Sequence, residues 1–287
     1  MPWPSDRPAS APTCVGCGTV FPVRDGIVSI AAVVEEGDYP AALHDVVAHV
    51  EARHFWFEAR NRIILAAMRR TLGPLEARRL LEVGCGSGYV LAMLEGAGLD
   101  VCGVDMHRAA LEMARDRIHG PLLCSSATRL PFFDDFDIVG LFDVIEHADN
   151  DVGLLRQART VLRPHGQVVV TVPAGAHLWT AYDQATGHKR RYSRQSLADT
   201  LNRGVFHVTY LAAFNCLPLM AQRLYRRFTT PVDVAESSGT EIVRQALRVP
   251  PGPLNRLFAW LMRVEAPLRG LPFVRGGSLI AIGETTD

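Results

Sequence analysis

A glycine-rich turn between two apolar segments constrains the fold of this chain more than any other feature. Residues 79–83 are largely apolar, and residues 100–104 form a second apolar stretch that ends at Asp105. Three glycines follow the first stretch: Gly84, Gly86 and Gly88. Glycines permit a sharp turn and a close approach of the backbone to a ligand, and the N-terminus of the next helix favours an anion. The pattern predicts strand, turn, helix and strand, with a carboxylate at the tip of the second strand.

Two acids restrict what this turn can bind. Asp105 stands where a carboxylate can accept hydrogen bonds from both hydroxyls of a ribose, and Glu82 precedes the first glycine. Glu82 would repel a pyrophosphate, but it can hold an ammonium group. Nicotinamide enzymes favour G-x-G-x-x-G, whereas Tyr89 occupies the position of that third glycine here. The segment therefore predicts a pocket for a nucleoside with a polar, amino-bearing tail.

The run from Glu82 to Gly88, E-x-G-x-G-x-G, resembles motif I of class I S-adenosylmethionine (SAM) methyltransferases. The resemblance implies a SAM-dependent methyltransferase with SAM as its cofactor. Three alternatives stay open: a nicotinamide oxidoreductase, a SAM-binding module without turnover, and a glycine turn that binds no nucleoside. The residues expected to bind the cofactor are Glu82, Gly84, Gly86, Gly88, Asp105, Met106, Ser126, Ala127, Phe142, Trp56 and Arg60.

Composition excludes some classes of partner. Thirty basic residues balance thirty acidic ones among 287, so no global positive field would attract a nucleic acid. No stretch reaches the roughly 18 uninterrupted apolar residues of a spanning helix, and the N-terminus lacks the apolar core of a signal peptide. We therefore expect a cytoplasmic protein with free thiols.

The first 39 residues are expected to form a separate unit. Residues 1–12 are rich in proline, alanine and serine, which predicts disorder. Cys14 and Cys17 begin a zinc-ribbon-like hairpin that resembles the Trm112-like module found before bacterial methyltransferases. A structural zinc needs four ligands, and no second cysteine pair lies nearby. We favour a degenerate hairpin without metal, and a zinc ion shared between two chains is the alternative.

Strand and helix patterns alternate through the rest of the chain. Strands are expected near 79–83, 100–104, 121–124, 136–142, 167–172, 205–212 and 277–282, with helices near 40–72, 88–96, 107–118 and 150–162. This order predicts a doubly wound, Rossmann-like, seven-stranded sheet in one domain over residues 40–287. The resemblance implies that the last strand runs antiparallel to its neighbours.

A helical insertion is expected at about 213–272, before the last strand. Leu257, Phe258, Trp260, Leu261 and Val264 alternate with arginines in an amphipathic pattern. The insertion can pack on the core or cover the substrate. Alternatively, this helix forms a peripheral membrane contact or a homodimer face, since arginines flanking Trp and Phe suit an interface.

Two candidate cofactor contacts carry alternatives. Relatives in the resembled family place an acid for the adenine amino group at the position of Ser126, where a hydroxyl can still accept one hydrogen bond. The Ala127 N–H can donate to the adenine ring. In the helix that begins near His54, Trp56 or Arg60 can reach the methionine carboxylate of SAM, or the helix simply packs at the edge of the core.

The phrase Asp143-Val-Ile-Glu146-His147 resembles D-V-I/L-E-H of ubiquinone-type and related methyltransferases. It follows a strand end, where ligands bind in such sheets. His147 is a candidate general base, or a structural histidine that holds a loop. Asp143, Glu146 and His147 can also ligate a divalent ion, although three such ligands fit Mg²⁺ poorly without substrate oxygens. We expect no metal.

The loop after the fifth strand contains W…Y-D…G-H-x-R-R-Y-S, which resembles the same family; the whole resemblance covers roughly residues 50–283. His188 or Tyr182 is expected to orient or deprotonate the acceptor. Arg190 or Arg191 can pair with an acidic group of the acceptor, or with Asp183 in an internal network. The expected substrate contacts are Asp183, Arg190, Arg191 and Tyr192.

The methyl acceptor is expected to be a small molecule with a reactive hydroxyl. No N-P-P-Y-like phrase, which would suit a planar nitrogen, occurs in the chain. A lipid- or polyprenyl-linked acceptor reached through the helical insertion is the alternative. The chain does not indicate the identity of the acceptor.

Overall fold

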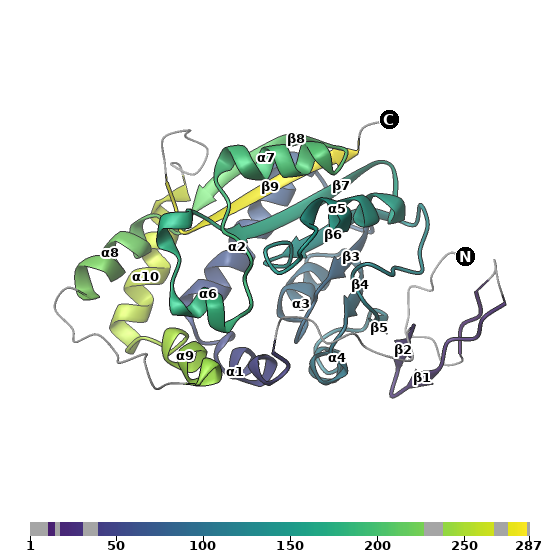
Figure 1. The fold of residues 1–287 in the computed structure, drawn as a ribbon, viewed down its shortest axis with the longest axis horizontal. Coiled ribbons are helices and arrows are strands. Elements are labelled where there is room, and N and C mark those ends of the chain that lie inside the picture. Colours follow the sequence, from purple (N-terminus) through teal and green to yellow (C-terminus); the bar gives the residue numbers. More distant parts are fainter. Residues whose placement is uncertain (1–10, 15–17, 31–39, 227–237, 267–274, 286–287) are drawn as a thin grey trace.

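The structure, a computed structural model, describes residues 11–14, 18–30, 40–226, 238–266 and 275–285. One twisted sheet runs through the molecule, with helices on both faces (Figure 1). Its strands are β1 (Val23–Arg24), β2 (Ile27–Ser29), β3 (Arg79–Val83), β4 (Asp100–Asp105), β5 (Leu122–Cys124), β6 (Phe136–Phe142), β7 (Leu162–Pro173), β8 (Phe206–Phe214) and β9 (Ser278–Thr285). The helices are α1 (Ala42–Val50), α2 (Phe55–Leu72), α3 (Tyr89–Gly96), α4 (Arg108–Arg115), α5 (Asp151–Val161), a 3₁₀ turn (Ala176–Leu178), α6 (Ala181–Ala185), α7 (Arg194–Arg203), α8 (Leu217–Arg226), α9 (Gly239–Ala246) and α10 (Gly252–Val264).

The strand order confirms the doubly wound fold. Strands lie in the order β1-β2-β5-β4-β3-β6-β7-β9-β8, and β9 is antiparallel to both β7 and β8. From β3 the chain first adds β4 on one side of this strand and later adds β6 on the other side, so β4 and β6 flank β3. Ligands bind beyond the carboxyl ends of the strands at such a switch point.

The sheet is wider than the seven strands that we expected. The N-terminal hairpin β1–β2 is part of it, because Ile27, Val28 and Ser29 pair in parallel with Leu122, Leu123 and Cys124 of β5. Ile27 and Val28 are fully buried by this pairing. The expected disordered segment lies largely outside the described residues, as does Cys17, so the zinc question stays a prediction.

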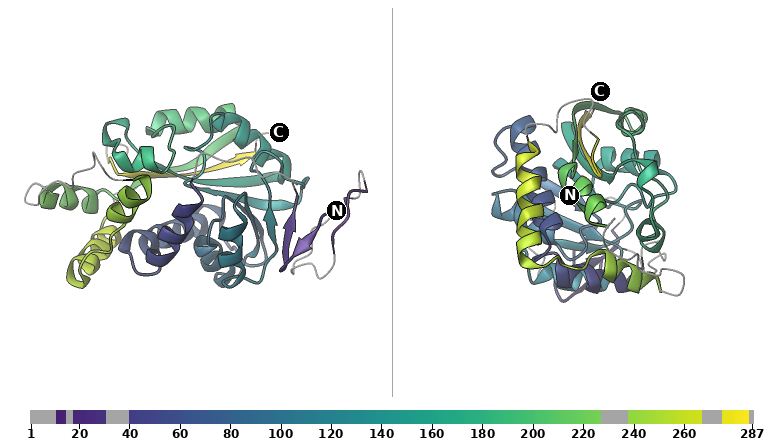
Figure 2. Two further views of the ribbon diagram at one scale, coloured as in Figure 1. Left: turned by 60° about the horizontal axis from the view of Figure 1, so that its bottom comes forward. Right: turned by 90° about the vertical axis from the view of Figure 1, so that its left-hand side faces the viewer.

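Side chains that alternate along the strands build two cores. Leu81 and Val83 pack with α5 and α7, whereas Leu80 faces the layer of α2, α3 and α4. Parallel strands buried on both faces require such near-continuous apolar runs. Figure 2 shows the sheet between these two helical layers. The arrangement leaves the carboxyl ends of β3, β4 and β6 to form a site.

The helix expected over 40–72 is two helices, and that expectation was wrong at the break between them. The chain leaves α1 after Val50, and α2 starts at Phe55. His54 ends the break, since its side chain accepts a hydrogen bond from the Trp56 N–H at 3.2 Å. The break lets α1 turn away from α2 and lie near α4.

The insertion before β9 holds α8, α9 and α10. These helices lie at the end of the molecule opposite the hairpin β1–β2 (Figures 1 and 2). α10 packs on α2, and α9 packs on α6 and α1. Within the described residues, every helix is too short or too polar to cross a membrane.

Candidate active site

The glycine turn between β3 and α3 has the backbone that the sequence predicts. Gly84, Gly86 and Gly88 have φ angles of 74°, 53° and 76°, in the left-handed region that disfavours other residues. A Cβ on Gly84 would lie 2.8 Å from Val144 Cγ2, and one on Gly88 would lie 2.9 Å from Ala114 Cβ. A Cβ on Gly86 would approach only His44 Nδ1, at 3.8 Å. The backbone therefore packs tightly at both ends of the turn and is more open at Gly86.

Asp105 ends β4 beside this turn and fixes its shape. The carboxylate accepts the Gly86 N–H at 2.9 Å on one oxygen and the His107 N–H at 2.8 Å on the other. The side chain is buried, with 6% of the residue exposed. Each carboxylate oxygen has a second lone pair that can accept a ribose hydroxyl. Asp105 is thus placed to organise the turn and to contact a nucleoside at once.

Glu82 is buried within β3, two residues before the first glycine. Its Oε2 has no hydrogen-bond partner among the described residues. Burial raises the pKa of Glu82 well above its usual value, and the positive charge of Arg60 partly opposes that rise. A buried acceptor without a partner costs free energy, so an ammonium group brought next to it would be stabilising. Contact of Glu82 with the amino group of SAM stays a prediction.

Arg60 and Trp56 of α2 lie at the same end of the sheet as the glycine turn. The Arg60 guanidinium forms an ion pair with Asp143, and it lies 4.8 Å from the centre of the Trp56 ring. Its Nε is buried with no partner among the described residues. The same side of α2 continues along the core through Ile63, Ile64 and Met68. The helix therefore packs at the core edge, which is one of the two alternatives that the sequence left open, and contact of Trp56 or Arg60 with the methionine carboxylate of SAM stays a prediction.

Four further residues that were predicted to bind the cofactor lie at the ends of neighbouring strands. Met106 follows β4, Ser126 and Ala127 follow β5, and Phe142 is the buried last residue of β6. The Ser126 hydroxyl lies 2.9 Å from the Thr128 hydroxyl, so it is engaged within its own loop. Contact of these four residues with the cofactor stays a prediction, as does contact of Ser126 and Ala127 with its adenine.

Sequence analysis missed α1 as part of this site. The Ser87 hydroxyl donates to both carboxylate oxygens of Glu51, at 2.8 and 2.9 Å, and Arg117 forms an ion pair with Glu51. The rings of His44 and His107 lie 4.8 Å apart beside the turn. Burial lowers the pKa of His44, and the charge of Asp105 opposes the effect. The apolar pattern of α1 predicts a helix but carries no signal of what it covers.

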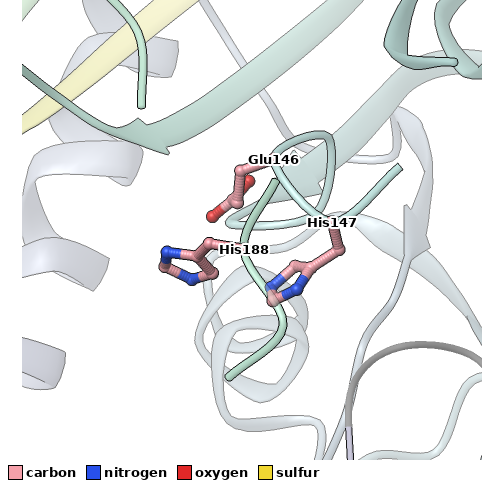
Figure 3. A group of neighbouring side chains, drawn as sticks. All are labelled: Glu146, His147 and His188. Atoms are coloured by element: carbon pink, nitrogen blue, oxygen red, sulfur yellow. The ribbon is translucent and has the colours of Figure 1, made fainter. Parts of the chain in front are cut away.

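A second cluster lies beyond the end of β6, where Glu146, His147 and His188 meet (Figure 3). The rings of His147 and His188 are 4.8 Å apart and nearly perpendicular. Glu146 is fully buried, and neither carboxylate oxygen has a partner among the described residues. Burial raises the pKa of Glu146 well above its usual value, and the nearby charge of Asp143 adds to this. The structure thus brings together the two histidines that were predicted separately.

One ligand atom from each of these three residues lies within 4.8 Å of the others. Such a group can hold a divalent ion if further ligands complete the shell. The expectation of a metal-free cluster stays a prediction. The set also differs from the one considered from sequence, since His188 replaces Asp143, which pairs with Arg60.

Asp183 holds His188 in place. Its fully buried carboxylate lies 2.8 Å from His188 Nδ1, accepts two hydrogen bonds from Arg191 at 2.7 and 3.0 Å, and accepts the Thr180 N–H at 2.8 Å. Burial alone would raise the pKa of Asp183, but the hydrogen bonds from His188, Arg191 and Thr180 lower it below its usual range. A carboxylate on Nδ1 leaves Nε2 of the ring as the atom that can meet a substrate.

The remaining residues of this loop also bind within the protein. Arg190 pairs with Asp151 at 2.9 Å and donates to the Ala148 carbonyl at 2.9 Å. The Tyr192 hydroxyl donates to Asp151 at 2.8 Å, and burial and this bond raise the pKa of Tyr192. Arg191 and Asp183 thus form the internal pair that the sequence left open, whereas Arg190 and Tyr192 bind Asp151 instead. Their direct contact with an acceptor stays a prediction.

Tyr182 stands beside His188, with ring centres 6.1 Å apart. Burial raises the pKa of Tyr182, with Asp143 and Asp183 adding to the effect. The phenol therefore stays protonated near neutral pH, so it can donate a hydrogen bond to an acceptor but is a poor base. Its ring packs against Leu43 and Val46 of α1 and Val243 of α9. The helix α6, which holds Tyr182, thus packs with α1 and α9 beside the cluster.

Comparisons with known proteins relate this chain to methyltransferases. Residues 81–170 match a family described as a methyltransferase domain. A ubiquinone biosynthesis O-methyltransferase of Alkalilimnicola ehrlichii is 25% identical over 179 residues, which are 52% of this chain and 71% of the relative. Another, of Bradyrhizobium diazoefficiens, is 33% identical over 108 residues, 36% of this chain and 42% of the relative.

Solved structures share the fold at low identity. A SAM-dependent methyltransferase of Thermotoga maritima has a TM-score of 0.53 and 17% identity over 85% of this chain and 98% of its own. The [4+2]-cyclase SpnF has a TM-score of 0.55 and 18% identity over 85% and 95% of the two chains. The fold by itself thus does not define the reaction. The turn from Glu82 to Gly88 and Asp105 lie within the matched residues 81–170, and together they identify this part of the chain as a methyltransferase domain of the SAM-dependent type.

Proposed function

We propose that the protein transfers the SAM methyl group to a hydroxyl oxygen of a small-molecule acceptor, with His188 as the base. The observation that carries this proposal is the Asp183–His188 pair at 2.8 Å, set beside His147 and Glu146 beyond the end of β6. The similarity to ubiquinone biosynthesis O-methyltransferases supports oxygen as the acceptor atom.

The donor needs little activation, because its sulfonium makes the methyl group electrophilic. In an in-line displacement, the acceptor oxygen forms the new C–O bond as the C–S bond breaks, and the sulfur takes the bonding electrons. Positioning supplies most of the rate enhancement. The hydroxyl proton passes to Nε2 of His188, while Asp183 on Nδ1 stabilises the imidazolium that forms.

The closed surroundings of the cluster favour this step. Tyr182 can donate its phenolic proton to the acceptor, and the apolar side chains of Leu43, Val46 and Val243 reduce access of water. Hydrogen bonds and charges act more strongly in such a water-poor site than in solvent.

The test is methyl transfer from labelled SAM to a panel of phenolic, carboxylic and amine acceptors, with the product site determined by NMR. His188→Gln should lower turnover by roughly 10²–10⁴-fold with unchanged SAM affinity. His119→Gln is the matched control, because its side chain is 98% exposed and it pairs with Glu95, away from the cluster. Methylation of nitrogen alone, or full turnover in His188→Gln, would reject the proposal.

The same assay decides between a base and a cation at this cluster. Activity that persists in EDTA supports the histidine base. Activity that EDTA removes and a divalent ion restores would instead assign Glu146, His147 and His188 as cation ligands.

An acceptor with a lipid tail is the second candidate, and the exposed apolar side chains of α10 favour it. Adding acceptors that differ only in the length of an alkyl chain tests this candidate. A KM that falls steadily as the alkyl chain lengthens supports a lipid-tailed acceptor, and a KM that does not change with chain length opposes it.

A further inference from the structure

The outer side of α10 carries apolar residues that stay about half exposed in the described part of the chain. Phe258 and Met262 are buried against the core, whereas Leu257, Trp260 and Val264 are 46%, 55% and 40% exposed. These three residues recur at a spacing that places them along one side of the helix. Met220 on the neighbouring α8 is 67% exposed. We call Leu257, Trp260, Val264 and Met220 the outer apolar face.

The inner contacts of α10 fix the direction of this face. The Phe258 ring lies 5.1 Å from that of Phe55 on α2. The Asn255 side chain accepts the Phe55 N–H at 3.0 Å and donates to the Arg53 carbonyl at 2.9 Å. After α10, the buried Glu265 carboxylate accepts the Leu217 N–H at the start of α8, at 3.0 Å. These contacts anchor the inner sides of α8 and α10, and the residues of the outer apolar face remain exposed.

The charged residues of α10 are of one sign. Arg256 and Arg263 are its exposed charged residues. Over the whole chain the positive and negative charges cancel, so α10 is basic relative to the chain as a whole. An acidic surface would complement it, whereas a second copy of the face would bring arginine against arginine.

We propose that α8 and α10 dock on the headgroup layer of an anionic membrane, with the outer apolar face inserted. An amphipathic helix with Trp and Leu on one side and arginines beside them lies in the plane of the interface. At 13 residues, α10 is about 20 Å long, which suits a helix that lies on the surface. This inference concerns binding and does not depend on which atom accepts the methyl group.

The experiment is co-sedimentation of the full chain with vesicles of phosphatidylcholine alone or mixed with phosphatidylglycerol. Binding should require the anionic lipid and weaken with salt. Arg256→Gln combined with Arg263→Gln should reduce binding by about 30-fold. Trp260→Ala should reduce it by about tenfold. Phe133→Ala is the matched control, because Phe133 is 79% exposed in a loop outside α8 and α10.

Folding and cofactor binding are monitored separately, by circular dichroism and by SAM calorimetry, and both should be unchanged in these variants. Equal binding to neutral vesicles, or full binding by Trp260→Ala, would overturn the proposal. Light scattering measures the oligomeric state. If the protein does not bind vesicles and forms a dimer that Trp260→Ala dissociates, the outer apolar face binds a second copy of the chain instead.

Discussion

Replacement of Asp105 by alanine tests the cofactor pocket most sharply by mutation. The carboxylate accepts N–H groups from Gly86 and His107, at 2.9 and 2.8 Å, and it keeps one lone pair on each oxygen for a ribose hydroxyl. Hydrogen bonds to a charged group contribute about 1.5–3 kcal/mol each, and relaxation and water recover part of the loss. We therefore expect SAM binding to weaken by roughly 1–3 kcal/mol, or about 5- to 150-fold.

Calorimetry with S-adenosylhomocysteine measures this loss without turnover. Asp100→Ala is the matched control, since Asp100 begins the same strand and pairs with Arg79 at 3.3 Å, far along β4 from the turn. The control should bind like the unmodified protein. An unchanged Kd for a folded Asp105→Ala variant would remove Asp105 from the binding site and refute the geometry argued above.

Three further predictions concern stability and are read by urea denaturation. Gly88→Ala should lower the free energy of unfolding by about 1–3 kcal/mol more than Gly73→Ala does. Both glycines have φ near 75°, but a Cβ on Gly88 would lie 2.9 Å from Ala114 Cβ, whereas one on Gly73 would meet no atom within 4 Å. Equal losses in the two variants would contradict this close approach. Glu146→Gln should become more stable relative to the unmodified protein as pH rises above about 4.5. The carboxyl of Glu146 loses its proton in the unfolded chain above that pH but keeps it when buried, so folding of the unmodified protein becomes less favourable. A stability difference that does not change with pH would contradict this prediction. Burial lowers the pKa of His54 to about 4. The free energy of unfolding should therefore fall by up to roughly 3 kcal/mol as pH drops from about 6.5 to 4. His54→Asn, which keeps a helix-capping side chain, should remove this dependence on pH.

The features that sequence predicts well are local. The bounds of β3 and β6 agree with the apolar runs at 79–83 and 136–142, because buried parallel strands need such runs. Gly84, Gly86 and Gly88 are identifiable because the left-handed backbone that they adopt is disfavoured for other residues.

The features that sequence missed depend on contacts between distant segments. β2 pairs with β5 across nearly a hundred residues, and a three-residue strand carries no signal of that partner. Glu51 meets Ser87 only because the chain breaks at His54, which is not a common helix-capping residue. Asp183 illustrates the same limit, since the sequence allows it to contact substrate or Arg191 and only the fold shows the second contact.

A crystal structure of the protein with S-adenosylhomocysteine tests the central claim most directly. It should show the ribose hydroxyls on Asp105, the amino group near Glu82 and the sulfur facing the cluster of His147 and His188. A ligand bound elsewhere, or a sulfur pointing away from that cluster, would contradict the account.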